Sequence, residues 1–186
     1  MTYGSTTNCK AAGGSTRTEY QCRLGYEVTS QYISNGVGYS DIKLQLEVRS
    51  INSSYQTYGY NQTTTIDGTA LAAKSFDMRN TNTWQIFGTR TITVAHDGNG
   101  NYSASKSGSF TTTATGTYSL KSGSASVTVS PAQIILTVGA VNIKETNGTV
   151  RNCPYVRVKD TSGVVHNIKY IMMKETNGTI RQIKLK

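Results

Sequence analysis

Residues 37–50 read VGYSDIKLQLEVRS, and apolar and polar side chains alternate along this stretch. Every second position from 42 to 48 is aliphatic: Ile42, Leu44, Leu46 and Val48. A period of two places alternate side chains on opposite faces of a β-strand. The stretch therefore predicts a strand with one buried face and one solvated face.

The sequence on both sides of this stretch continues the β pattern. Asp67-Gly68 and the run HDGNGN at 96–101 are turn signals, because Gly, Asp and Asn accept the positive φ of tight hairpins. Tyr, Thr and Ser dominate between the turns, as is typical of strands, and no stretch shows a helical period. We expect antiparallel strands at residues 19–33, 37–50, 55–66, 70–76, 84–95, 102–110 and 115–129.

These strands and turns predict an immunoglobulin-like antiparallel β-sandwich at residues 19–130, since about seven short strands with frequent turns are typical of that fold. Trp84 is the only tryptophan, and we expect it to be the core anchor. Residues 1–18 are small, polar and glycine-containing. We expect them to form a flexible N-terminal arm, or a segment that orders only against a neighbouring subunit.

Residues 131–186 form a second β domain, most of which is a gapless repeat. The copies are residues 141–155, 156–170 and 171–185, and each holds Lys, an acid, Thr, Asn or Ser, and Gly at the same places. We expect a β-hairpin in each copy, with the glycine in the turn. Because an isolated hairpin is marginal in water, the three hairpins are expected to stack or to assemble with other chains.

The formal net charge of the chain is +9, and residues 131–186 carry most of it. A basic surface attracts nucleic acid, an anionic cell envelope or an acidic protein, whereas a solvated β surface with interspersed lysines is the structural alternative. The repeats contain two tyrosines, Tyr155 and Tyr170, which are too few for a nucleic-acid stacking platform. We therefore predict no specific nucleic-acid partner. The candidate surface-binding residues are Lys144, Arg151, Lys159, Lys169, Lys174, Arg181, Tyr155 and Tyr170.

The cysteines and the N-terminal sequence indicate synthesis and retention in a cytoplasm. Three scattered cysteines do not make a disulfide framework, and we expect reduced thiols at Cys9, Cys22 and Cys153. The first ten residues lack the basic and apolar pattern of a secretory leader. No stretch reaches the ~18 apolar residues of a membrane span, so we predict no membrane insertion.

Candidate catalytic and metal-binding residues are few. His96 lies beside Asp97 before a turn, and His166 takes a place that holds arginine in the other repeats. The sequence contains no G-x-S-x-G elbow and no evident carboxylate pair. Asp97-x-Asn99-x-Asn101 resembles the start of a calcium loop, but the glycine that such a loop needs at its sixth position is absent. We therefore predict a non-enzymatic protein with no metal and no cofactor.

Three short motifs lie along the predicted strands and turns. The first is SQYISN at 30–35, which precedes the alternating strand. The second is IDG at 66–68, and the third is TITVAH at 91–96. The third motif leads into the turn DGNG at 97–100. In this order the motifs resemble a family of siphophage virion proteins of Gram-positive hosts, which tends to have Asp where this chain has Asn99.

The resemblance covers roughly residues 25–130, and it implies a virion component without catalytic residues. The repeats are similar to strand–turn–strand tails at the ends of phage fibre proteins. We therefore expect a non-enzymatic, tail-associated structural protein of the virion, assembled in the host cytoplasm. The expected partners are other virion proteins, further copies of this chain and host cell-wall carbohydrate. The alternatives are a capsid decoration or head-fibre protein and, in another class, a stand-alone carbohydrate-binding adhesin module.

Overall fold

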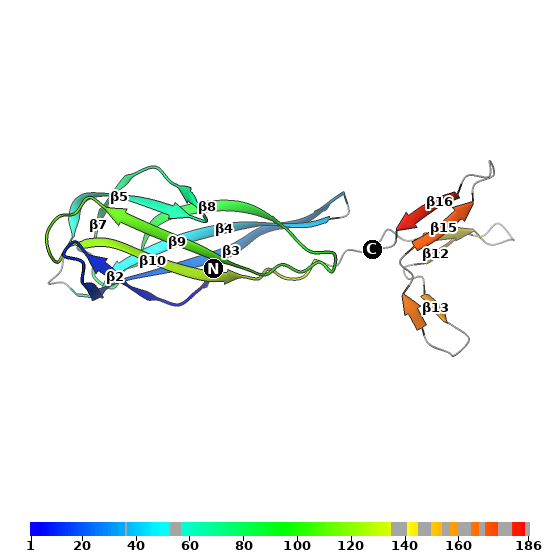
Figure 1. Cartoon of the computed structure of the whole chain (residues 1–186), viewed down its shortest axis with the longest axis horizontal. Helices are drawn as coiled ribbons and strands as arrows, with labels where there is room; N and C mark the ends of the chain where they lie inside the picture. Colours follow the sequence, from blue (N-terminus) through cyan, green and yellow to red (C-terminus); the bar gives the residue numbers. More distant parts are fainter. Residues whose placement is uncertain are drawn as a thin grey trace.

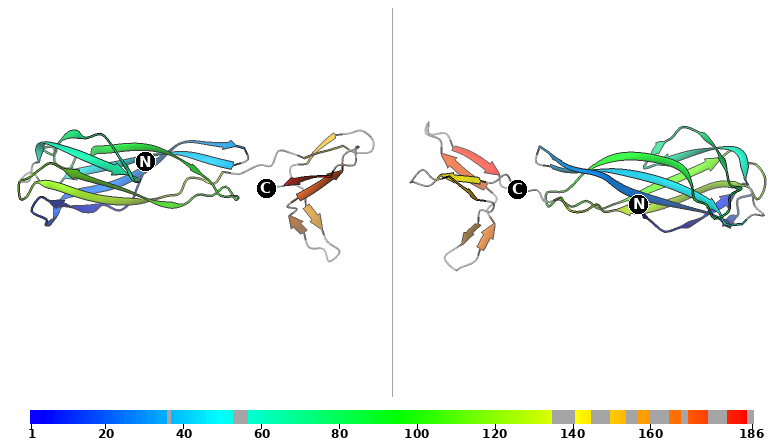
Figure 2. Two further views of the ribbon diagram at one scale, coloured as in Figure 1. Left: turned by 45° about the horizontal axis from the view of Figure 1, so that its top comes forward. Right: turned by 180° about the vertical axis from the view of Figure 1, so that it is seen from behind.

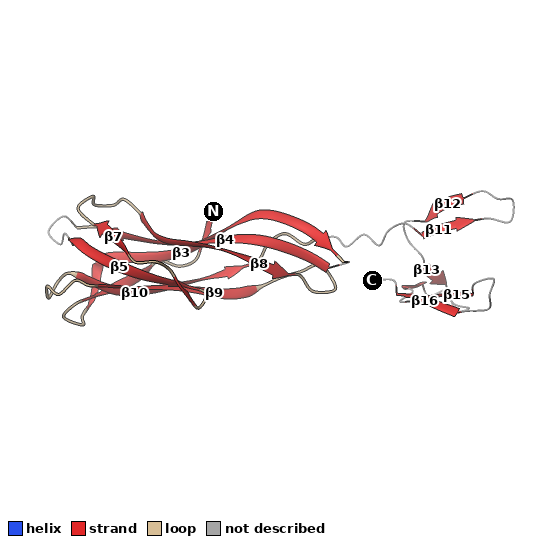
Figure 3. Ribbon diagram, turned by 90° about the horizontal axis from the view of Figure 1, so that it is seen from above, coloured by secondary structure: helices blue, strands red, loops and turns tan. Residues whose placement is uncertain are grey.

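The computed structural model describes residues 1–35, 37–52 and 57–134 with their side chains, and the backbone of six short strands between 141 and 184. All regular secondary structure in these residues is β, and every pairing between the named strands is antiparallel (Figure 3). None of the described residues forms a helix that could cross a membrane. The prediction of an all-β, antiparallel fold is confirmed.

Ten strands between residues 2 and 129 form one sheet (Figure 1). They are β1 (Thr2–Tyr3), β2 (Thr7–Ala11), β3 (Thr16–Ser34), β4 (Val37–Ser50), β5 (Tyr58–Ile66), β6 (Thr69–Ala70), β7 (Lys74–Asp77), β8 (Gln85–Ala95), β9 (Ala104–Thr112) and β10 (Leu120–Val129). Their order is β6-β5-β9-β10-β2-β3-β4-β8, with β1 paired to β3 and β7 paired to β5. Figure 2 shows from two further sides that β3 and β4 are the long strands of this sheet.

The alternating stretch forms the centre of the core, as its period predicts. β4 spans residues 37–50, and its four aliphatic side chains at positions 42 to 48 are fully buried. Full burial of one such side chain stabilises the fold by about 1.5–3 kcal/mol. The predicted turn is also present, since Asp67 and Gly68 both have positive φ and connect β5 to β6.

The sheet folds over on itself, so that β5, β9 and β10 lie opposite β3, β4 and β8 (Figures 1 and 2). Phe87 of β8 contacts Phe76 of β7 and Phe110 of β9, with ring centroids 5.4 Å and 4.8 Å apart. The buried amide of Gln62 on β5 donates to the carbonyl oxygen of Phe87 at 2.8 Å. Aromatic packing and this satisfied polar group therefore connect the two halves across the core.

Residues 1–18 differ from the flexible arm that we expected. The strand β2 pairs with β3 on one side and with β10 on the other. The side chains of Cys9 and Ala11 in β2 are buried. The hydrogen-bonded path between the two halves of the sheet thus runs through this five-residue strand.

Two buried thiols lie where β2, β3 and β10 meet. Cys9 and Cys22 are free cysteines, which agrees with the prediction of reduced thiols, whereas the side chain of Cys153 lies outside the described residues. Hydrogen bonding to Cys22, together with burial, raises the pKa of Cys9. The hydrogen bond from Cys9 is the main cause that lowers the pKa of Cys22 to about 7. Glycine at position 123 lets β10 lie close to both thiols. A Cβ atom there would lie 2.8 Å from the Cys9 Sγ and 3.1 Å from the Cys22 Sγ.

The strands of the C-terminal part pair with the same register in all three sequence repeats. They are β11 (Val141–Lys144), β12 (Val150–Cys153), β13 (Arg157–Lys159), β14 (Val165–Asn167), β15 (Tyr170–Lys174) and β16 (Ile180–Lys184). β11 pairs with β12, β13 with β14, and β15 with β16. The repeat lysine pairs with the same later position in every copy, as Lys144↔Val150, Lys159↔Val165 and Lys174↔Ile180.

A methyl group at position 123 tests the close approach of β10 to the thiols. We expect Gly123→Ala to lower the free energy of unfolding by about 1–3 kcal/mol, because the core around a new Cβ has to shift. Urea denaturation followed by fluorescence measures the change. Gly98→Ala is the matched control, because a Cβ at Gly98 meets no atom within 4 Å. Equal stability of the two variants would contradict the packing described at this junction.

Candidate functional site

The binding residues predicted in the repeats have no described side chains. Tyr155 and Lys169 lie outside the described residues. For the remaining predicted positions the structure describes the backbone alone, namely Lys144, Arg151, Lys159, Lys174, Arg181 and Tyr170. A candidate site is therefore sought among residues 1–134.

Trp84 is not the core anchor that we predicted. The indole is half-buried and lies outside the core cluster, with the guanidinium carbons of Arg23 and Arg49 at 4.1 Å and 4.6 Å from its ring. Trp84 is two positions from the exposed Ile86, so both lie on the outer face. Phe87 lies on the opposite face and is the buried aromatic residue of β8. Tryptophan therefore supplies a cation–π surface on the outside of the sheet.

The outer face of β4 is covered at Glu47, although the alternation predicted a solvated face. Glu47 is only 6% exposed, and its carboxylate accepts hydrogen bonds from Arg23 at 2.7 Å, Tyr3 at 2.9 Å and Gln45 at 2.6 Å. Burial, and then the hydrogen bond to Glu47, raise the pKa of Tyr3, so the phenol stays a neutral donor. A buried carboxylate is tolerated when it is paired in this way.

Two of the motifs quoted above meet on β4. The hydroxyls of Ser30 on β3 and Thr93 on β8 each donate to Asp41 at 2.6 Å, and in that order they lower the pKa of its carboxyl group. One residue earlier, the hydroxyl oxygen of Ser40 accepts a hydrogen bond from Gln31 at 3.1 Å. His96 contacts the same hydroxyl from the β8 side.

His96 has the geometry of a structural clamp. Its Nδ1 lies 2.7 Å from the carbonyl oxygen of Gly100, which is an acceptor only, so Nδ1 carries the proton. In the neutral ring Nε2 is then the acceptor for the Ser40 hydroxyl, at 2.7 Å. Ser40 and His96 are both buried, so this serine–histidine pair holds the 96–101 turn against β4 with no exposed nucleophile.

Asp97 closes the same turn. One of its carboxylate oxygens accepts from the backbone N–H groups of Asn99 at 2.9 Å and Asn101 at 2.8 Å. These bonds are those of an Asx-type turn, which accounts for the resemblance of the sequence to a calcium loop. Among the residues with described side chains, no three His, Cys, Asp or Glu residues come close enough to hold a metal ion.

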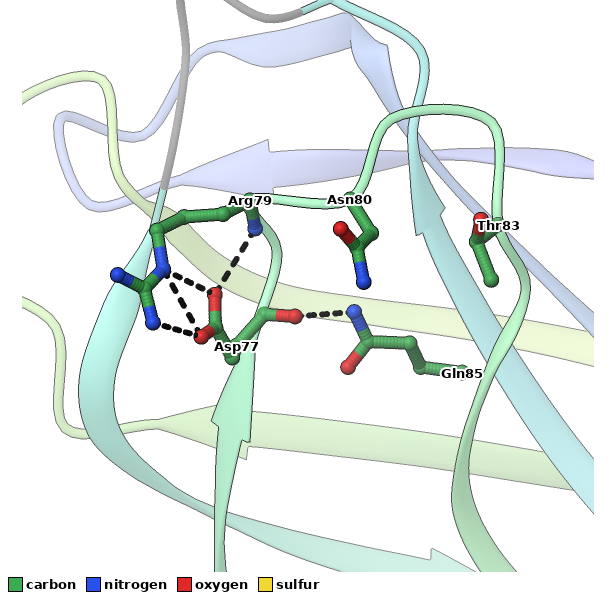
Figure 4. A pocket seen from close by; sticks show the side chains of 5 residues that line it. All are labelled: Asp77, Arg79, Asn80, Thr83 and Gln85. Atoms are coloured by element: carbon green, nitrogen blue, oxygen red, sulfur yellow. Dashed lines mark hydrogen bonds and ion pairs between the residues drawn. The ribbon is translucent and has the colours of Figure 1, made fainter.

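An open polar pocket of about 420 Å³ lies between the end of β7 and the start of β8 (Figure 4). Its frame is held by the backbone, because Met78 N–H donates to Thr57 O at 2.9 Å and Asn82 N–H donates to Ser50 O at 2.6 Å. Met78 is also fully buried. The lining residues are Asp77, Arg79, Asn80, Thr83 and Gln85.

The pocket combines a closed ion pair with unused polar groups. Arg79 donates to Asp77 through Nε at 3.0 Å and 2.9 Å and through Nη2, and its side-chain hydrogen bonds are the main cause that lowers the pKa of Asp77. The amide nitrogen of Gln85 donates to the backbone carbonyl oxygen of Asp77. The side chains of Asn80 and Thr83 make no hydrogen bond to any other described residue, and Figure 4 shows them at the rim of the pocket.

Comparison of the chain with protein-family models, with curated proteins and with solved structures finds no match in any of the three.

Substitution of Trp84, directly before β8, and of Phe87 in β8 distinguishes a surface role of Trp84 from a core role. We expect Phe87→Ala to lower the free energy of unfolding by about 3–5 kcal/mol, the cost of a large core cavity. We expect Trp84→Ala to cost only about 1–2 kcal/mol, the sum of two partly exposed cation–π contacts. Thermal or urea unfolding provides the comparison. A loss at Trp84 as large as that at Phe87 would restore Trp84 as the core anchor.

Removal of the His96 ring tests its role as a clamp. His96→Ala removes two buried hydrogen bonds and leaves the Ser40 hydroxyl without its acceptor. We expect a loss of about 2–4 kcal/mol in the free energy of unfolding. Asn99→Ala is the control, because Asn99 is exposed on the same turn. If both variants unfold at the same urea concentration, the clamp contributes nothing to stability.

Proposed function

We propose that this chain is a non-enzymatic structural protein of a bacteriophage virion, associated with the tail and acting in assembly or in contact with the host surface. The observation that carries the proposal is the meeting of two family-like motifs on β4. Residues 30–35 and 91–96 are far apart in sequence, yet both hydrogen-bond to Ser40 and Asp41. The sequence resemblance thus falls on residues that depend on one another in the fold.

The finer fold assignment belongs to the same proposal. Without β2, the hydrogen-bonded order separates into β6-β5-β9-β10 and β3-β4-β8. Two antiparallel sheets packed over a common core are the arrangement of an immunoglobulin-like sandwich. We therefore treat the sheet as a sandwich that β2 joins along one edge, followed by a module of three hairpin repeats.

The repeats support assembly as the mode of action. Their strands share one register but are only 3–5 residues long. Two-stranded hairpins of this length are marginal alone and gain stability by packing against other hairpins or other chains. The proposed partners are further copies of this chain and other virion proteins, with the basic character of residues 131–186 adding attraction to anionic wall polymers.

Two alternatives use the same fold. A capsid decoration or head-fibre protein needs the same sheet and the same repeats, and differs in its place on the particle. A stand-alone carbohydrate-binding adhesin is favoured by the polar pocket between β7 and β8. The buried Ser40–His96 pair supports the non-enzymatic part of the proposal, because a nucleophile has to reach a substrate.

Immunogold electron microscopy of intact particles, with antibody against residues 141–186, tests the proposed location. We expect gold along the tail or at its tip. Gold spread over the head would replace the tail assignment with capsid decoration. If the protein is present in infected cells but no particle carries gold, the virion proposal is wrong.

A further inference from the structure

The pocket between β7 and β8 is the place where exposed polar groups converge on a firmly held frame. The chain enters it at the buried Met78 and is held again at Asn82, whose backbone N–H donates to Ser50 O at 2.6 Å. Thr81 next to it forms a bridge with Ser50. Asn80 lies between these fixed points, Thr83 follows Asn82 directly, and both are exposed. A backbone held in this way loses little freedom when a ligand binds.

We propose that this pocket binds a neutral sugar unit of a saccharide. The proposal rests on the proposed function, because it names the ligand class through which the chain would contact a host surface. Sugars carry hydroxyl groups that donate and accept hydrogen bonds, and they need both kinds of partner close together. Hydrogen-bond donors and acceptors both line the pocket. They are supplied by the side-chain amides of Asn80 and Gln85 and by the hydroxyl of Thr83.

The charge of the pocket favours a neutral ligand. Asp77 and Arg79 cancel each other, and their contacts engage both carboxylate oxygens together with the Nε and Nη2 atoms of the guanidinium. The pair therefore leaves no net charge among the five lining residues to attract an ion. Neutral hydroxyl groups can instead bond to the remaining guanidinium nitrogen and to the neighbouring amides.

Size and an aromatic neighbour agree with this ligand class. A volume of about 420 Å³ lies in the range of small-molecule sites. Tyr58 is 52% exposed, and the Arg79 guanidinium carbon lies 4.6 Å from its ring centroid, so the tyrosine stands beside the pocket wall. An exposed tyrosine offers apolar ring surface to the C–H groups of a sugar at little entropic cost. Binding at one open site is expected to be on the order of 1 mM, and assembly of several copies multiplies it.

Titration of the ¹⁵N-labelled chain of residues 1–186 with glucose, galactose and N-acetylglucosamine, each followed by NMR chemical shifts, tests the site. We expect at least one sugar to give saturable shifts at the amides of Asn80, Thr83 and Gln85. The double variant Asn80→Ala/Thr83→Ala is expected to weaken that binding by at least about tenfold. The matched control Asn8→Ala/Thr91→Ala removes the same side chains from exposed strand positions and is expected to bind like the parent.

Two results would overturn the sugar site. One is the absence of saturable shifts at these residues with all three sugars, at concentrations well above the millimolar range. The other is tighter binding of sulfate than of any sugar at the same residues, which would make the pocket an anion site. The particle-labelling experiment is independent of both results. Gold on the tail without sugar binding removes only the ligand assignment, whereas sugar binding without gold on any particle removes only the virion assignment.

Discussion

The structure depends on the pairing of β2 with strands on both of its sides. Five residues at 7–11 carry the hydrogen bonds that join β3 to β10, and these two strands belong to opposite halves of the folded sheet. The core lies between the halves, so the join fixes their separation as well as their order. The space between β10 and the thiols of Cys9 and Cys22 is too small for a Cβ atom at position 123. A side chain larger than hydrogen on β10 at this point would force the halves apart.

Two polar clusters flank β4, which lies between β3 and β8. On the outer face, Glu47 is surrounded by donors from three different parts of the chain. At the far end, Ser40 and His96 join the turn at 96–101 to β4. Each buried polar group in these two clusters has its partners, so both clusters contribute to specificity of the fold. The pocket at residues 77–85 is different, because part of its polar surface is left for a ligand.

The sequence predicts local structure well where a period or a turn signal is present. The alternation at 37–50 and the Asp67-Gly68 turn define a strand and a hairpin because both are local properties of the chain. Residues 1–18 and Trp84 were interpreted wrongly because their surroundings are set by distant residues. The short polar strand β2 is recognisable only once β10 is known to lie beside it. The two arginines that flank Trp84 come from β3 and β4.

The candidate site was equally hidden from the sequence. Its lining residues follow no motif spacing, and they converge because Met78 is buried and Asn82 is hydrogen-bonded to Ser50. A polar loop is the ordinary expectation for such a composition. Only the positions of the side chains distinguish a pocket from a solvated loop.

The place of β2 in the sheet also sets an order of events during synthesis. Residues 7–22 leave the ribosome before residues 120–129 and can pair locally, but the second edge of β2 has no partner until residues 120–129 have been made. In that interval the nascent chain exposes an open strand edge that carries Cys9. Exposed edges invite pairing with other chains. Slower translation between residues 22 and 120 would lengthen the interval in which this edge is open.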